Sequence, residues 1–265
     1  MSEWKIQQGR VSLLPSVAGM GKLPSPLKLF TAIWDREPEN FQNPAHINPL
    51  SPAIANGDIG EMVGGITVHP LRIDITLSAL APTQLATSPI LIGDVARYWE
   101  NMRLLAARVA DLDIPLTIGR VASFTQVTDI EADRASANKI ISRVLPAPFT
   151  GALTDERDFT LQLNKPAKSQ SVDGIEMNYL TRWSVDVIQL LTLNIATQVE
   201  QGNNASPSAM HSVASFTAAN ISFDFNNAQV ERALTDQEQS LLLTETVAKA
   251  EGNFREIVKS GGADA

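Results

Sequence analysis

Charged side chains on the polar faces of predicted strands offer the most specific chemistry in this sequence. Arg72 and Asp74 are two residues apart and therefore share one face of a strand over 71–79. By the same rule, Asp224 points away from the face that carries its apolar neighbours in the chain. If the predicted strands are neighbours, one polar groove collects five charged side chains: Arg72, Asp74, Arg182, Asp186 and Asp224.

Two interpretations of this polar groove differ in kind. A groove of carboxylates and arginines suits a divalent metal, and hence a hydrolase or a nucleic-acid-processing enzyme, if Asp74, Asp186 and Asp224 converge in a concave site. The simpler interpretation is cross-strand ion pairing on a solvated sheet, which is worth less than about 1 kcal/mol per pair. We favour the ion pairs and keep the enzyme as the alternative.

Other catalytic patterns are absent from the sequence. The three histidines, His46, His69 and His211, show no spacing that places two of them on one face of an element. A serine nucleophile lacks the G-x-S-x-G turn. The chain has no cysteine, which excludes disulfides, thiolate metal sites and cysteine nucleophiles. We therefore predict no metal and no cofactor, and we lean against catalysis.

Composition is typical of a globular protein. Twenty-nine acidic and 21 basic side chains in 265 residues give a formal net charge of −8, which disfavours bulk binding of nucleic acid. The most apolar run, 185–196, is interrupted by polar residues and is too short for a membrane span. The first ten residues lack the pattern of a secretion signal, so we expect a cytoplasmic location and no membrane.

Alternating apolar and polar residues predict the strands. The alternation is strict over 71–79, and it recurs over 159–163, 183–195 and 221–225. Weaker strand candidates lie at 4–14, 27–34, 62–68, 116–127, 174–181 and 212–219. Because these strands have one apolar and one polar face, they favour an antiparallel sheet. The adjacent glycines at 64 and 65 indicate a bulge or a close approach of another backbone segment.

In three segments the apolar residues recur at the spacing of a helix. The first helix spans about 90–110 behind Asp94 as a candidate N-cap. Thr128 to Glu131 has the form of a capping box and predicts a second helix that ends before Pro146. Thr235 to Glu238 is another capping box and begins a third, long helix. The expected fold class is α+β, an antiparallel sheet covered by three amphipathic helices.

Each half of the chain ends in an amphipathic helix after a group of strands. The boundary between halves falls at 146–157, so one division is an N-terminal α+β half at 1–150 and C-terminal strands plus the long helix at 151–265. One continuous domain is the other option.

Two long polar connections are candidate contact surfaces. Residues 35–60 contain four prolines, and 198–211 is rich in turn-forming residues. A connection longer than about 15 residues without regular structure is usually functional or disordered. Candidate contact residues in the two connections are Phe41, His46, Asn48, Asn203 and Asn204.

These features favour binding over catalysis. The sequence predicts an assembly protein of the cytoplasm that presents 35–60 and 198–211 to a protein partner. Self-association is a further option, because the apolar stripe of the third helix packs either on the sheet or against a second subunit. A receptor for a small ligand requires an enclosed apolar pocket with a few convergent polar groups, and a sequence pattern does not reveal one.

Overall fold

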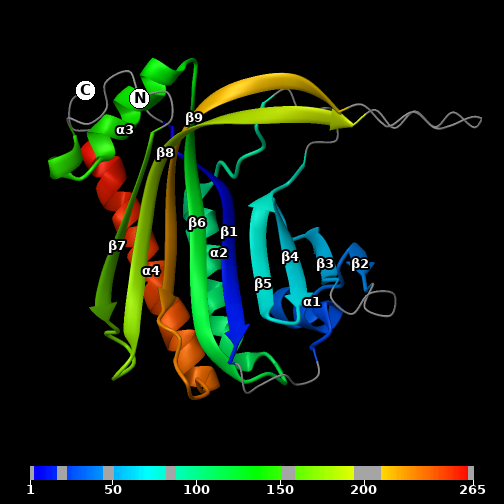
Figure 1. The fold of residues 1–265 in the computed structure, drawn as a ribbon. Helices are drawn as coiled ribbons and strands as arrows, with labels where there is room; N and C mark the ends of the chain where they lie inside the picture. Colours follow the sequence, from blue (N-terminus) through cyan, green and yellow to red (C-terminus); the bar gives the residue numbers. More distant parts are fainter. Residues whose placement is uncertain are drawn as a thin grey trace, which may run out of the picture.

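The computed structural model describes residues 3–16, 23–43, 51–81, 88–150, 159–193 and 210–261 of the chain. In this part of the protein the fold is α+β, because four α-helices accompany one nine-stranded antiparallel sheet (Figure 1). The helices are α1 (Pro26–Trp34), α2 (Val95–Arg108), α3 (Arg134–Val144) and α4 (Asp236–Gly261). The strands are β1 (Lys5–Pro15), β2 (Asn40–Gln42), β3 (Ala53–Asp58), β4 (Met62–His69), β5 (Arg72–Ala79), β6 (Ile118–Glu131), β7 (Thr160–Lys168), β8 (Glu176–Leu193) and β9 (Met210–Asn227).

The order of the strands repeats about the middle of the sheet. The order is β2-β3-β4-β5-β1-β6-β9-β8-β7, with β1 and β6 paired at the centre. Reading outward from the centre, β1, β5, β4 and β3 on one side correspond to β6, β9, β8 and β7 on the other. In each half a helix follows the central strand and a second helix follows the last strand. The division into two domains at 150/151 stays a prediction, since this one sheet contains strands from both sides of it.

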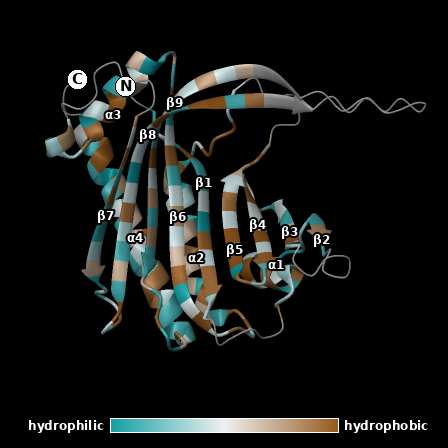
Figure 2. Cartoon of the chain, in the orientation of Figure 1, coloured by the Kyte–Doolittle hydropathy of each residue, from teal (hydrophilic) through white to brown (hydrophobic). Residues whose placement is uncertain are grey.

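The helices lie on one face of the sheet. Apolar side chains of the strands point to this face, so that Val11, Ile75 and Phe223 are fully buried. Figure 2 shows the resulting bands of hydrophobic and hydrophilic residues along the strands. The opposite face carries the polar residues of the same strands and is called the open face below. Among the described helices, none combines the length and the apolar composition that crossing a membrane requires.

Two glycines let the helices press closely on the sheet. A Cβ on Gly64 of β4 would lie 2.9 Å from the ring of Trp34 in α1. A Cβ on Gly9 of β1 would lie 2.2 Å from the hydroxyl oxygen of Tyr98 in α2. The neighbour at Gly64 is thus a side chain rather than the expected backbone segment or bulge, and only a residue without a side chain leaves room for the tryptophan.

The structure corrects three expectations about local structure. Residues 26–34 form helix α1 rather than a strand, since Leu29, Phe30 and Ile33 are buried at helical spacing behind a proline in the first turn. This helix brings the number of described α-helices to four rather than three. Thr128 to Glu131 is the end of strand β6. Helix α3 begins later, at Arg134, and its N-cap is Asp133, whose carboxylate accepts a hydrogen bond from the backbone N–H of Ser136 at 2.8 Å.

The third correction concerns the connection 35–60. It contains strands β2 and β3, and Ala55 of β3 is fully buried. The two expected N-caps at the other helices are confirmed. Asp94 accepts a hydrogen bond from the N–H of Arg97 at 2.9 Å, and Thr235 and Glu238 bond each other's backbone N–H as a capping box does.

Candidate functional site

The helix side of the sheet is covered unevenly in its two halves. Helix α1 packs on the outer strands β3 and β4 of the first half. Its counterpart α3 packs on β9, β8 and β6, which lie nearer the centre of the sheet. The face of β7 that corresponds to the covered face of β3 is therefore not filled by a helix. A groove of about 920 Å³ remains there, between β7 and β8 on one side and α4 on the other.

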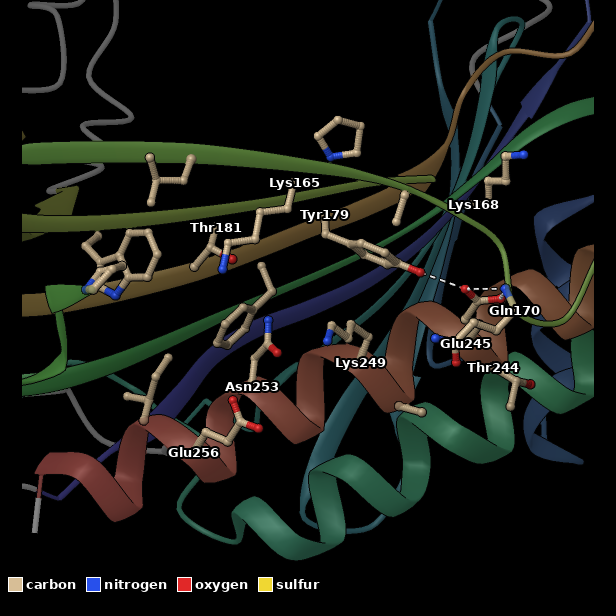
Figure 3. Close-up of a pocket in the computed structure, with 18 of the residues that line it drawn as sticks. Lys165, Lys168, Gln170, Tyr179, Thr181, Thr244, Glu245, Lys249, Asn253 and Glu256 are labelled. Carbon is tan, nitrogen blue, oxygen red and sulfur yellow. Dashed lines mark hydrogen bonds between the residues drawn. The ribbon is translucent and has the colours of Figure 1, made fainter. Parts of the chain in front are cut away.

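The walls of this groove, called the β7–α4 groove below, come from distant parts of the chain. Lys165 and Thr181 point into the groove from the strands, and Lys249 and Asn253 point into it from α4 (Figure 3). Apolar side chains complete the walls: Leu145, Leu163, Ala167, Phe223 and Ile257. About half of the residues that line the groove are polar or charged and the rest are apolar, so the groove offers both kinds of contact to a ligand.

One end of the β7–α4 groove is fixed by Glu245 of α4. Its carboxylate accepts hydrogen bonds from the hydroxyls of Tyr179 at 2.6 Å, Ser169 at 2.7 Å and Ser171 at 2.5 Å. The backbone N–H groups of Gln170 and Ser171 also donate to it, each at 3.1 Å. Glu245 therefore holds the turn between β7 and β8 against the helix (Figure 3).

The environment of Glu245 keeps its carboxylate ionised. Burial by itself would raise the pKa, but the hydrogen bonds from Ser171 and from Tyr179 outweigh burial and lower the pKa of Glu245 to about 2. The pKa of Tyr179 is raised, first by burial and then by its bond to this carboxylate and by the negative charge. Glu245 is thus a fixed acceptor over the whole physiological pH range, and Tyr179 stays protonated.

Among the described residues, three donors of the groove have no partner: the exposed ammonium groups of Lys165 and Lys249 and the indole N–H of Trp183. No carboxylate of the described residues lies within 4 Å of the ammonium groups of Lys165 and Lys249. The indole N–H of Trp183 is buried and has no acceptor, and this side chain is only 6% exposed. An unpaired buried donor costs about 1–3 kcal/mol.

The structure separates the charged residues that the sequence placed on one polar face. Asp74 lies on β5, where it accepts a hydrogen bond from Ser12 at 2.6 Å and pairs with Arg72 at 2.7 Å and with Arg10 at 3.8 Å. Asp224 lies on β9, and the strands β1 and β6 separate it from β5. At about 4.8 Å per strand, the backbones at Asp74 and Asp224 are about 14 Å apart.

Asp186 and Arg182 lie on β8, also on the open face. Asp186 accepts hydrogen bonds from Ser184 at 2.6 Å and from Asn220 at 2.9 Å. Arg182 is exposed and, within the described chain, forms no ion pair with either Asp186 or Asp224. The three aspartates therefore do not converge, and no group of three metal-ligating side chains occurs in the ranges that the structure describes.

The candidate contact residues of the two connections are described only in part. Phe41 lies on the edge strand β2, and its side chain is 45% exposed. Four other candidates lie outside the described residues: His46, Asn48, Asn203 and Asn204. Strand β2 pairs with β3 through Phe41 and Ala55, so the start of the expected connection belongs to the sheet.

The residues of the β7–α4 groove were not identified from the sequence. They come from the end of α3, from β7 to β9 and from α4, which are separated by up to about a hundred positions. The alternation around Trp183 correctly placed its side chain on an apolar face, but it did not indicate that a groove lies beside that face. No known protein-family model matches the chain, and no solved structure matches it.

Proposed function

We propose that this chain is a non-catalytic binding protein and that the β7–α4 groove takes an anion with an apolar body. The observation that carries the proposal is a pair of ammonium groups beside apolar walls: Lys165 and Lys249 both line the groove, and neither forms an ion pair with a described carboxylate. The two ammonium groups suit a carboxylate, sulfonate or phosphate. The apolar walls suit a hydrocarbon or aromatic body.

The charge of the groove supports an anionic ligand. The whole chain has a formal net charge of −8, so groove lysines that form no ion pair with a described carboxylate are an exception to its average field. Glu245 already accepts hydrogen bonds from the protein, and its charge is engaged at the end of the groove. Glu256 is the other acidic residue in the walls. The three lysines of the walls, Lys165, Lys168 and Lys249, outnumber these two acids.

The same geometry argues against acid–base catalysis in the groove. A general base works best when its pKa lies near the working pH. The pKa of Glu245 is about 2, and its lone pairs are occupied by hydroxyl and backbone donors. Tyr179 donates a hydrogen bond to this carboxylate, and its pKa is raised by burial and by that bond. These two side chains therefore position the groove and do not transfer protons.

A pair of fluorescent probes tests the proposal. We expect 8-anilinonaphthalene-1-sulfonate to bind in the groove and N-phenyl-1-naphthylamine, which has the same apolar body without the sulfonate, to bind more weakly. The double variant Lys165→Gln, Lys249→Gln should weaken binding of the sulfonate about fivefold to thirtyfold, because each ammonium contributes about 1 kcal/mol near the anion. Binding of the neutral probe should change less than twofold. Fluorescence titration measures both affinities.

The control is Lys28→Gln on α1, which removes an exposed charge in the other half of the sheet. It should leave both affinities unchanged. The proposal is contradicted if the double variant loses affinity for both probes equally, or if its affinity for the sulfonate is unchanged. A thermal unfolding curve for each variant excludes a general loss of structure.

The sequence hypothesis of a cytoplasmic assembly protein is compatible with a ligand groove and stays a proposal beside it. The exposed ring of Phe41 on the edge strand β2 supports a contact of the connection 35–60 with a partner or with a second copy of the chain. Native mass spectrometry of the chain from its own cells is the test. A second polypeptide or a clean multimer supports assembly, and a monomer with a small adduct supports the groove alone.

A further inference from the structure

Strand β7 has an unpaired edge beside the β7–α4 groove. It is the last strand of the described sheet and pairs on one side only, with β8. Its side chains alternate, so that Leu161, Leu163 and Lys165 point to the groove side, while Gln162 and Asn164 point to the open face. A segment that lies along this edge therefore has access both to backbone groups and to the groove.

The register shows which backbone groups of β7 are available. Phe159 accepts a hydrogen bond from the N–H of Val185, and Ser169 donates one to Ile175. Both pairs follow the same register as β7 and β8, so the odd-numbered residues of β7 form the hydrogen-bonded pairs with β8. The N–H and C=O groups of Thr160, Gln162 and Asn164 consequently point outward.

Pro166 limits the length of this edge. It is an even-numbered residue of β7, so its position is one at which the backbone N–H would point outward. Proline has no N–H, and therefore the ladder to β8 loses nothing while the outer edge loses one donor. The usable edge is Thr160–Asn164, which at about 3.4 Å per residue is about 17 Å long.

We propose that the ligand of the groove is an extended acidic peptide segment that adds to β7 as an antiparallel strand along Thr160–Asn164. This inference rests on the function proposed above, because it uses the same groove and the same lysines. Backbone hydrogen bonds to the edge give affinity, and alternate side chains of the peptide point to the groove side. There an acidic side chain meets Lys165 or Lys249, and an apolar side chain meets Leu163.

A designed peptide is the probe. Its sequence is acetyl-Thr-Glu-Thr-Val-Thr-Glu-Thr-amide, which places Glu, Val and Glu on one face and Thr on the other when extended. In an antiparallel pair, residues directly opposite share a face and form the same type of pair. The threonines therefore lie opposite Gln162 and Asn164, and their N–H groups point to β7.

Isothermal titration calorimetry with two methylated peptides tests the strand addition. N-methylation of the second and third threonines removes donors that face β7, and we expect at least tenfold weaker binding. N-methylation of the valine and the second glutamate removes donors that face solvent, and we expect less than threefold weaker binding. The two peptides have the same mass, charge and number of methyl groups, so only the direction of the lost donors differs.

Two protein variants complete the test. Gln162→Pro removes an outward N–H of β7 without removing a bond to β8. It should weaken binding of the parent peptide at least fivefold and leave the affinity for the naphthalenesulfonate unchanged. Lys165→Gln should weaken both ligands. Equal affinities of the two methylated peptides overturn the strand addition. If the sulfonate binds and the parent peptide does not, this inference is wrong and the groove proposal stands. If neither binds, both are wrong.

Discussion

Replacing Glu245 by glutamine measures how much the fixed end of the groove contributes to stability. The carboxylate accepts three hydroxyl hydrogen bonds of 2.5–2.7 Å, from Ser169, Ser171 and Tyr179. Hydrogen bonds to a charged group contribute about 1.5–3 kcal/mol each and neutral ones about 1 kcal/mol. Glutamine keeps one oxygen acceptor and loses the charge. We expect Glu245→Gln to lower the free energy of unfolding by about 1–2 kcal/mol at pH 7.

The pH dependence of this loss follows from the pKa of Glu245, which folding lowers from 4.5 to about 2. A carboxyl group whose pKa is lowered stabilises the fold above its unfolded pKa and loses this contribution as the pH falls through the folded pKa. Converted in full, the shift corresponds to about 3 kcal/mol. Since Glu245 is only partly buried, solvent screening reduces this to about half, which agrees with the estimate from the hydrogen bonds.

Urea unfolding of both proteins between pH 2.5 and pH 8 is the assay. The difference in free energy of unfolding should be constant above about pH 5 and should fall steadily toward pH 2.5. The control is Glu256→Gln on the same helix, whose exposed side chain should change stability by less than about 0.5 kcal/mol at every pH. A difference that persists undiminished at pH 2.5, or no difference at pH 7, refutes the reasoning.

Two glycine substitutions should act in opposite directions in the same urea assay. Gly64→Ala places a Cβ 2.9 Å from the Trp34 ring, so we expect the free energy of unfolding to fall by about 1–3 kcal/mol. Unchanged stability would refute the close packing of α1 on β4. Gly252→Ala lies in α4, where the added Cβ would have nothing within 4 Å beyond its chain neighbours and the backbone of its own helix. The better helix propensity of alanine should therefore raise stability by about 0.5–1 kcal/mol. A loss at Gly252 would show that the helix surface there is covered.

Errors in the sequence interpretation arose where a local pattern had two physical meanings. Residues 27–34 are rich in residues that favour strands, yet the burial of Leu29, Phe30 and Ile33 follows a helix. Pro26 in the first turn was the signal that could have identified α1. The capping-box pattern at Thr128 has the correct residue types, but β6 pairs with β1 and β9 there, and pairing on both sides outweighs a cap.

The charged residues of the polar face show the limit of periodicity. Alternation correctly predicted that Asp74 and Asp224 point away from the apolar face of their strands. It contains no information about strand order, and the order places β1 and β6 between them. A shared face is a local property, whereas a shared site requires neighbouring strands.

The sequence by itself determined the α+β class, the antiparallel strands and the capped ends of α2 and α4, because each depends on side-chain periodicity or on hydrogen bonds within a few residues. Only the tertiary structure decided where a site lies. The β7–α4 groove exists because α3 packs nearer the centre of the sheet than α1 does. That displacement leaves room between β7 and α4, and it results from packing among segments that are far apart in the chain.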